Sequence, residues 1–457
     1  MATNKYPTRS APDQYSSSAV IGPCLYCGAP AGRLALRIGA EPPPPALIRA
    51  LGEVRAAAAL ANRDCGALDQ ARSEALARAA LQVSVQPPDA WSRPLWQDGG
   101  GAGLAYPLDA AILEVARGHA DIRPEDVRRH QCVDAVQTAL HMAALRLWET
   151  GLSPALAHLT GLLEQKAAAW SDLIKIGRTH LQDAAPLTLG QEVSGWLQQV
   201  RNGRSRLSAA AEDLLAVPFG QGCVGTGAGV PAGFAASAIR RLAERTGLAL
   251  RPSPDALADL TGPGRIAFFH AALATLATAL FKISSDVRLL ASGPAAGFNE
   301  LRLPETGLPC SSLPGKTNPD AAEALAQVCV QVIGADGAVS LAASQGQFES
   351  NGFLPLLAFN VLRSATLLAD AIRVFADHGV AGLKPRTDVL AFNVAQSVML
   401  VTALAPHIGY DVAAKIARDA YQRKVSLREA ALASGVVDAE TYERLVRPER
   451  MLGPNGG

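Results

Sequence analysis

The stretch CSSLPGKTNPDAAEAL, residues 310–325, places two serines, a Gly-Lys pair and an Asn-Pro pair directly before an apolar segment. Proline fits the first turn of a helix, so the sequence predicts a helix that begins near Pro319. Free backbone N–H groups at a helix start attract an anion, and Lys316 and Asn318 add a positive charge and a hydrogen-bond donor there. Such groups bind a carboxylate. The alternative is a surface loop with an incidental lysine.

Long segments with apolar residues at three- and four-residue spacing lie on both sides of this stretch. Strand patterns of alternating β-branched residues between tight turns are almost absent. The sequence therefore predicts an all-helical (all-α) protein whose long helices pack as a near-parallel bundle. Segments near 260–290 and 319–344 are apolar on more than one side, which suggests contacts between subunits. The periodic segments are residues 135–152, 187–217, 256–290, 319–344 and 355–378.

Composition along the chain predicts three domains: mixed loops and helices in residues 1–132, the bundle in 133–389, and a smaller helical unit in 390–457. In the first domain, prolines precede an Ala/Leu/Arg-rich helix that should end at Gly66. The proline- and glycine-rich residues 87–107 predict a loop.

Charge and hydropathy argue against several protein classes. The formal net charge is +1, from 42 basic and 41 acidic residues that are interspersed, so a nucleic acid or an anionic membrane is not expected as a partner. The first twenty residues are polar and lack the apolar core of a signal peptide. The longest apolar run, residues 267–281, is interrupted by His270 and is shorter than the roughly 20 residues that a bilayer requires. We expect a buried helix there and a cytoplasmic protein.

Seven cysteines are scattered along the chain, at positions 24, 27, 65, 132, 223, 310 and 329. Cys24 and Cys27 form a CxxC pair, but no second pair or His-x-x-x-His follows at zinc spacing. Reduced thiols are the simpler interpretation, and a metal or redox role for the pair is the alternative. No metal is predicted.

Two further stretches combine polar residues with glycine or proline between apolar helices. They are GRTHLQDAAPLTLGQE, residues 177–192, and GQGCVGTGAG, residues 220–229. In the smaller C-terminal unit, Ser426 and Glu429 have the spacing of a capping box at a helix start.

These motifs resemble those of the fumarase/aspartase superfamily. SSLPGKTNPDAAEA (residues 311–324) is similar to its signature, Gly-Ser-Ser-x-Met-Pro-(Gly/Ala)-Lys-x-Asn-Pro followed by a Glu-Ala pair. Residues 177–192 resemble the second family segment as class II fumarases carry it. The likeness continues in order through nearly the whole chain, and Gly315 before Lys316 is closer to fumarases than to aspartases. The other similar stretches are DVRLLASGP (286–294), FESNGFLP (348–355) and MLVTALAPHIGYDVAAKIA (399–417).

The resemblance implies a three-domain helical subunit in a homotetramer, with a twenty-helix core and active sites shared between three subunits. It implies a lyase that reversibly eliminates water, ammonia or a substituted amine from a succinate-like carboxylic acid to give fumarate. No metal or organic cofactor is expected.

The resemblance also implies residue roles. Ser311 would remove the proton beside the substrate carboxylate, which requires backbone N–H groups, a neighbouring cation and a site closed to water. Lys316 and Asn318 match the residues that bind that carboxylate and stabilise the dianionic aci-carboxylate. Thr179 matches a residue that hydrogen-bonds to a carboxylate. Gln182 and Ser312 are also expected to bind the substrate.

His180 would pair with Glu323 and act through a water on the leaving-group side. A carboxylate beside an imidazole raises its pKa and fixes its tautomer, as proton delivery requires. Without the family context, a single histidine in a helical protein is more often a packed polar residue.

The sequence departs from the family where the other end of the substrate should bind. Gly-Ser-Gly-Thr-x-Thr-Asn-x-Asn is replaced by GGGAGLAYP (residues 99–107), which puts Gly100 and Ala102 in the expected pocket. Ser-Ser-Asn-Asp is replaced by QCVD, so Gln131, Cys132 and Val133 take the places of the two serines and the asparagine. Val133 cannot hydrogen-bond through its side chain.

Smaller departures occur elsewhere. Gly222 and Gly229 replace a family threonine and asparagine, and the signature loop is one residue short at Leu313.

Losing several hydrogen bonds to one carboxylate, at about 1.5–3 kcal/mol each, would weaken substrate binding by orders of magnitude. Arg128 and Arg129 could replace the lost contacts, or they could be a solvated helix end.

The preferred hypothesis is an active carbon–oxygen or carbon–nitrogen lyase with a changed or enlarged substrate, in which the glycines of residues 99–103 open space or offer N–H donors. One alternative is an ordinary class II fumarate hydratase in which backbone groups compensate. Another is a catalytically inactive paralogue with a scaffold or regulatory role, and a third is a subunit that completes the sites of a mixed tetramer.

Overall fold

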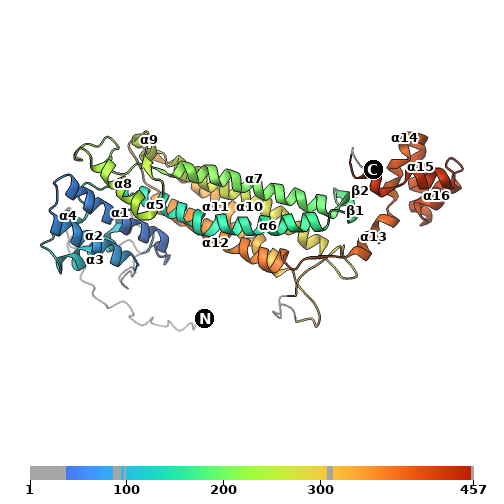
Figure 1. Ribbon diagram of the computed structural model, residues 1–457, viewed down its shortest axis with the longest axis horizontal. Coiled ribbons are helices and arrows are strands. Elements are labelled where there is room, and N and C mark those ends of the chain that lie inside the picture. The colour runs from blue at the N-terminus through green and yellow to red at the C-terminus, as the bar shows by residue number, and fades with distance from the viewer. Residues whose placement is uncertain (1–37, 86–93, 97–98, 306–311, 454–457) are drawn as a thin grey trace, which may run out of the picture. The chain divides into compact units, whose positions relative to one another are not determined.

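The computed structural model describes residues 38–85, 94–96, 99–305 and 312–453 (Figure 1). These residues form two compact units. The first contains the described residues up to 140 together with 217–261 and 347–355, and the second contains 141–216, 262–346 and the residues from 356 onward. The three-domain division expected from composition stays a prediction.

The first unit is built on the helix pairs α1–α2, α2–α3 and α1–α8. Helix α1 is rich in alanine, and its small side chains let α2 approach closely: a Cβ at Gly52 would lie 2.3 Å from Ser84 Cβ. Gly66, with φ of 73°, follows the end of α1, as the sequence predicted. The helices of this unit are α1 (Pro45–Asp64), α2 (Gln70–Val85), α3 (Ala102–Arg117), α4 (Pro124–Val127), α8 (Phe234–Thr246) and α9 (Ala256–Thr261).

The second unit contains the long bundle, in which α6, α7, α10, α11 and α12 run side by side (Figure 1). Gly203 on α7 faces Leu276 on α10, where a Cβ would come within 2.6 Å of Leu276 Cδ1, so a larger residue would require the Leu276 side chain to shift. The bundle helices are α6 (Ser153–Ala169), α7 (Leu189–Leu214), α10 (Gly264–Leu290), α11 (Asp320–Ala343) and α12 (Leu354–Phe375). Helix α5 (Val133–Leu147) and a π-helical turn, η1 (Trp148–Leu152), precede them.

His270, which interrupts the longest apolar run, connects three bundle helices. Its side chain is fully buried on α10, with Nδ1 2.8 Å from Asp336 Oδ1 on α11 and Nε2 3.0 Å from Ser364 Oγ on α12. Burial, opposed by the hydrogen bond and charge of Asp336, lowers the pKa of His270. This histidine is therefore a hydrogen-bonded core residue.

Three helical segments have the length and apolar composition that crossing a bilayer would require: Gly264–Leu290, Asp320–Ala343 and Leu354–Val380. In the bundle, α10 packs against both α7 and α11, which accounts for part of this apolar surface. The buried helix expected at residues 267–281 is buried on one side only. Apolar side chains stay exposed on α10 and α11, namely Phe268, Phe281, Val330, Ile333 and Leu341.

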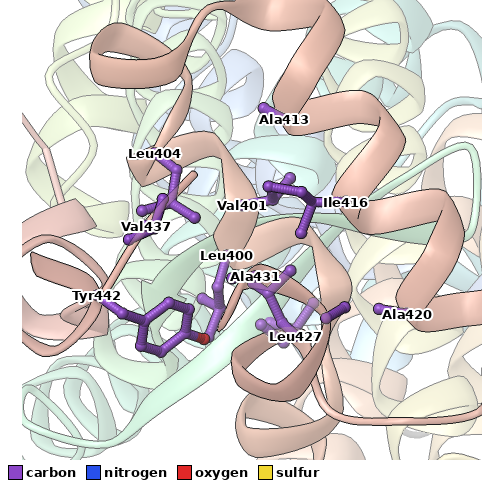
Figure 2. Close-up of a cluster of buried hydrophobic side chains, with 12 residues drawn as sticks. Leu400, Val401, Leu404, Ala413, Ile416, Ala420, Leu427, Ala431, Val437 and Tyr442 are labelled. Carbon is purple, nitrogen blue, oxygen red and sulfur yellow. The ribbon is translucent and has the colours of Figure 1, made fainter. Parts of the chain in front are cut away.

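The C-terminal helices form a separate small core within the second unit. Leu400, Val401 and Leu404 pack against Ile416 and other side chains from the following helices (Figure 2). The predicted capping box at Ser426 is confirmed, because its Oγ accepts from Glu429 N at 3.2 Å. The elements are α13 (Thr387–Gln396), η3 (Val398–Ala403), α14 (Ala405–Ile408), α15 (Tyr410–Arg423), α16 (Leu427–Ala433), α17 (Ala439–Leu445) and η4 (Pro448–Met451).

Three sequence expectations need correction. The segment 256–290 is two helices, because Gly262 and Pro263 separate α9 from α10. The loop predicted for residues 87–107 gives way to helix α3 at Ala102, and Pro107 lies inside that helix. The buried Leu104, Ala105 and Leu108 supply packing that outweighs the proline's missing hydrogen bond.

The mostly helical fold is confirmed, and the third correction concerns only the short strands within it, which the sequence pattern missed. Hairpin β1 (Ile174–Thr179) and β2 (Gln182–Thr188) is antiparallel. The other described strands are two residues each and pair as β3 (Ala216–Val217) with β4 (Arg251–Pro252), β5 (Leu301–Arg302) with β8 (Lys384–Pro385), and β6 (Gly346–Gln347) with β7 (Ser350–Asn351).

Candidate active site

The hairpin β1–β2 presents three of the expected site residues. Thr179 pairs with Gln182, so His180 and Leu181 form a two-residue turn at the tip. Both have positive φ, 54° and 61°, a conformation that costs a non-glycine residue about 1–3 kcal/mol. The turn lacks the Asn-Gly or Asp-Gly signal of such hairpins, which is why the sequence pattern did not reveal it. The strained turn leaves Thr179, His180 and Gln182 exposed at its end.

A buried ionic network fixes the base of this hairpin. Lys175 Nζ lies 2.8 Å from Glu192 Oε2 and 3.0 Å from Glu300 Oε2. Arg178 donates to Glu300 Oε1 at 2.6 Å, and Asn393 donates to the same oxygen at 3.1 Å. Burial would raise the pKa of Glu300, but the hydrogen bond from Arg178 and the charge of Lys175 hold it below its ordinary value. A charged Glu300 therefore holds the strand that leads to Thr179.

The hairpin is also anchored in the C-terminal core. Ile176 on β1 is 1% exposed and belongs to the apolar cluster that includes Leu400 and Leu404. Figure 2 shows the side chains of η3, α15 and α16 that form this cluster. Lys175 of the ionic network and Ile176 of the apolar cluster are consecutive residues of β1, so their side chains point to opposite faces and the position of the tip is set from both faces of the strand.

The head of α11 carries the second group of expected residues. Ser312 and Lys316 are exposed, Asn318 is half-buried, and Lys316 N donates to Leu313 O at 3.2 Å. Helix α11 begins at Asp320 after the N-cap Pro319, one residue beyond the predicted start. Ser311, the expected base, lies outside the described residues.

Glu323 lies in the first turn of α11 and is paired with a cation. Arg288 Nη2 is 3.3 Å from Glu323 Oε1, and the side chains of Arg288 and Glu323 are 40% and 43% exposed. Within the described residues of the single chain, His180 has no hydrogen bond or ion pair. The predicted His180–Glu323 pair is therefore not formed inside one chain.

Two of the glycines of residues 99–103, Gly99 and Gly101, serve close packing. A Cβ at Gly99 would lie 1.9 Å from Gly352 O, and one at Gly101 would lie 2.8 Å from Val136 Cγ1. Gly101 has φ of 77° and caps the start of α3, and Gly103 lies inside that helix. Gly99 and Gly101 thus do not open space as expected. Ala102 begins α3, and its side chain lies outside what the structure describes.

A pocket of about 280 Å³ brings the altered segments of the first unit together. We call it the altered pocket. Apolar atoms make up most of its surface. Its lining residues are Arg55, Gly100, Ala105, Tyr106, Arg128, Gln131, Cys132, Val133 and Val136.

The polar groups of the altered pocket bind one another. Arg55 donates to Asp109 Oδ1 at 2.8 Å and to Gln131 Oε1 at 2.7 Å, and Arg128 also donates to Asp109. The Arg128 guanidinium lies 4.5 Å from the centre of the Tyr106 ring. Arg129, in contrast, pairs with Asp126 and does not line the pocket. Sequence reasoning missed Arg55 and Asp109 because they are 54 residues apart and match no motif.

Asp134 connects the altered segment to the glycine-rich stretch. Its Oδ1 accepts from the N–H groups of Cys132 and Ala135, both at 2.8 Å. Its Oδ2 accepts from the N–H groups of residues 220, 221 and 222, at 2.9, 3.2 and 3.2 Å. Burial raises the pKa of Asp134, and the N–H donors oppose that rise. This aspartate, the one residue of the QCVD segment that matches the family, organises both loops.

The structure describes four of the seven cysteines. Cys24, Cys27 and Cys310 lie outside the described residues, and Cys65, Cys132, Cys223 and Cys329 are free thiols. Among the residues that the structure describes, no cluster of three or more His, Cys, Asp and Glu side chains could hold a metal ion.

Comparisons with known proteins cover both the hairpin β1–β2 and the head of α11. A family model described as Lyase matches residues 130–334, and one described as Fumarase C C-terminus matches residues 400–453. The chain is 42% identical over 430 residues to a class II fumarate hydratase of Thermosynechococcus vestitus, with 92% of each chain covered. It is 43% identical over 429 residues to that of Brucella suis, which covers 92% of this chain and 93% of the relative.

A solved structure gives the same result in three dimensions. The class II fumarase of Schistosoma mansoni superposes with a TM-score of 0.87 at 31% identity, covering 91% of this chain and 92% of that chain. Both units of the chain therefore have counterparts in such proteins, including the segments whose side chains differ.

Proposed function

The chain belongs to the fumarase/aspartase superfamily of lyases, and from that premise we propose that it reversibly adds water to the double bond of fumarate. The observation that carries this proposal is the hairpin tip. A buried ionic network and an apolar core hold a strained turn that exposes Thr179 and His180. Strain that the surrounding structure maintains is typical of functional sites.

In the proposed reaction, Lys316 and Asn318 bind one carboxylate of the substrate. Their charge and hydrogen bonds stabilise the negative charge that develops when Ser311 removes the neighbouring proton. His180 delivers a proton to the leaving oxygen through a water molecule. Thr179, Gln182 and Ser312 orient the substrate.

A homotetramer accounts for the residues that stay separate in one chain. Exposed apolar side chains on α10 and α11, such as Phe268, Val330 and Leu341, offer surface for helices of other subunits. We infer that the His180–Glu323 pair forms between subunits, with Glu323 exchanging its exposed contact with Arg288. Cytoplasmic location and independence of cofactors stay part of this proposal.

A second candidate substrate is favoured by the altered pocket. Its lining is mostly apolar at Ala105, Val133 and Val136, and the Arg55 guanidinium already binds Asp109 and Gln131. A free carboxylate would gain few hydrogen bonds there. A monocarboxylate or a substrate with a larger apolar end would fit this lining better than fumarate.

Turnover measurements decide between these substrates. Purified protein is given malate, fumarate, aspartate and an unsaturated monocarboxylic acid in turn, and the absorbance of the conjugated double bond is followed. We expect turnover of malate, with Lys316→Met lowering kcat/KM by about 10²–10³-fold because a charge that stabilises the transition state is lost.

The matched control is Lys415→Met, which removes an exposed lysine on α15 and should change nothing. Absence of malate turnover together with turnover of another unsaturated acid would establish the second candidate. Biological function that survives Lys316→Met would instead indicate the inactive paralogue.

A further inference from the structure

Two thiols from distant parts of the chain meet at the wall of the altered pocket. Cys132, directly before α5, and Cys223, in the glycine-rich stretch, are 91 residues apart, and their Sγ atoms lie 2.7 Å from each other. Cys132 is half-buried and lines the pocket, whereas Cys223 is exposed. One sulfur is therefore accessible to a reagent in solution and the other faces the pocket.

The same carboxylate holds the backbone on both sides of this contact. Asp134 accepts from the N–H of Cys132 at 2.8 Å and from the N–H of Gly222, the residue before Cys223, at 3.2 Å. Gly222 has φ of 71°, a conformation that glycine adopts readily. The approach of the two thiols is thus set by the fold and does not depend on side-chain rotation alone.

We propose that Cys132 and Cys223 form a reversible disulfide, which makes the wall of the altered pocket a site of oxidative modification with a peroxide as the oxidant. Sulfur atoms joined in a disulfide are about 2.05 Å apart, so a small movement converts the contact into a bond. Disulfides of this kind in reducing compartments are transient and redox-sensing.

The chemistry assigns different roles to the two cysteines. Burial, together with the contact to Cys223, raises the pKa of Cys132 to about 12, so Cys132 keeps its proton. Cys223 loses its proton, attacks the peroxide O–O bond and becomes a sulfenic acid as hydroxide leaves and takes up that proton. The Cys132 sulfur then attacks Cys223 Sγ, and the departing hydroxide takes the Cys132 proton. In sum, two thiols and one hydrogen peroxide give one disulfide and two water molecules, and a dithiol reverses the change.

The other described cysteines lack this arrangement. Cys65 Sγ lies 3.7 Å from Ala232 O, and Cys329 is fully buried on α11. Burial raises the pKa of Cys329 to about 12, which lowers its reactivity. Among the four described cysteines, oxidation is therefore expected to be selective for the pair.

Mass spectrometry of the full-length, assembled protein tests this proposal. The protein is treated with hydrogen peroxide without denaturant. It is then unfolded in denaturant, its free thiols are alkylated with iodoacetamide, and it is digested under non-reducing conditions. We expect a cross-linked peptide pair that contains Cys132 and Cys223 and has lost two hydrogen atoms. Dithiothreitol added before alkylation should remove it.

Two variants serve as matched controls. Cys223→Ser should abolish the cross-link and leave Cys132 alkylated, whereas Cys65→Ser should leave the cross-link unchanged. The proposal is overturned if both cysteines are alkylated after peroxide treatment, if Cys223 reaches the sulfinic acid without cross-linking, or if Cys132 bonds to another cysteine. This readout requires no turnover, so its failure and the failure of the proposed function are distinguishable.

Discussion

The altered pocket and the hairpin tip of β1–β2 differ in two respects: whether they retain the family's residues, and whether their polar side chains are hydrogen-bonded within the chain. The hairpin tip keeps the family residues Thr179 and His180, which are exposed and, in the case of His180, without a hydrogen bond in the described chain. The altered pocket has lost the family residues, yet its polar groups are satisfied: Gln131 binds Arg55, and Asp109 binds two arginines.

This difference separates residues kept for a ligand from residues kept for the fold. Exposed polar side chains on a strained, supported turn contribute nothing to packing, so their retention points to substrate or to another subunit. Buried polar side chains must be hydrogen-bonded whether or not a ligand binds. The altered pocket has hydrogen-bonded polar groups like those of a protein core, whereas the exposed hairpin tip is where we propose that the substrate binds.

The largest expected effect concerns the hairpin tip. His180→Gln should lower kcat by about 10²–10⁴-fold, because proton delivery to the leaving group is lost. The melting temperature should not fall, since the side chain is exposed. Steady-state kinetics with malate measure the first quantity and thermal unfolding the second. His158→Gln is the control, because it changes an exposed hydrogen bond with Asp377 and should retain activity. Equal kinetics for both variants would remove His180 from the mechanism.

Next in size is the loss of the carboxylate that connects the two loops of the altered pocket. Asp134→Ala leaves five backbone N–H groups without their acceptor and should lower the free energy of unfolding by about 3–5 kcal/mol. Chemical denaturation measures the change. Asp370→Ala, which breaks only an exposed pair with Arg373, should cost about 0–1 kcal/mol. Similar values for the two would show that Asp134 does not organise the pocket.

The ionic network under the hairpin gives a smaller, pH-dependent effect. Glu300→Gln should cost about 3 kcal/mol at neutral pH, because Lys175 and Arg178 lose a buried partner. The pKa of Glu300 is lowered in the folded state, so its contribution is complete above the ordinary value of 4.5 and is lost as pH falls through the folded-state pKa.

Unfolding followed from pH 7 downward tests this sign. Wild type should lose stability as the pH falls below about 4.5, and Glu300→Gln should lose less over the same range. Glu443→Gln, which breaks an exposed pair with Arg428, is the control and should follow wild type. A steeper loss in Glu300→Gln than in wild type would contradict the lowered pKa.

The smallest effect tests whether the altered pocket can still bind a carboxylate. Val133→Asn restores the family's hydrogen-bonding side chain and should lower KM for malate by about 3–10-fold, equivalent to about 0.5–1.5 kcal/mol. Val133→Ala, which adds no donor, should not. An unchanged KM in Val133→Asn would favour the second candidate, a substrate without a carboxylate at this end.

Sequence patterns predicted the long helices because their apolar spacing extends over many residues. The capping box at Ser426 and the helix end at Gly66 were predictable for a different reason, since each depends on only a few adjacent residues. Patterns failed where packing outweighed local preference: Pro107 lies inside α3, and the β1–β2 turn forms without glycine or asparagine.

The candidate site residues also fall into two groups, those predicted from short motifs and those brought together only by folding. Motif order gave the positions of Thr179, His180, Lys316 and Asn318 and the family to which the chain belongs, because short motifs encode a reaction through neighbouring residues. How the polar groups of the altered pocket are hydrogen-bonded was not readable from the chain. Arg55, Asp109 and Gln131 come from three separate segments, and only folding brings them within hydrogen-bonding distance.

By itself, then, the sequence determined a mostly helical lyase of known family, and it predicted the residues that we propose bind a carboxylate. The tertiary structure decided that the altered segments form a satisfied, mostly apolar pocket and that two cysteines 91 residues apart come into contact. The physical reason is the distance along the chain over which each kind of interaction acts. Helix propensity and motif chemistry act over a few neighbouring residues, whereas pocket lining and thiol pairing depend on contacts that exist only after the chain has folded.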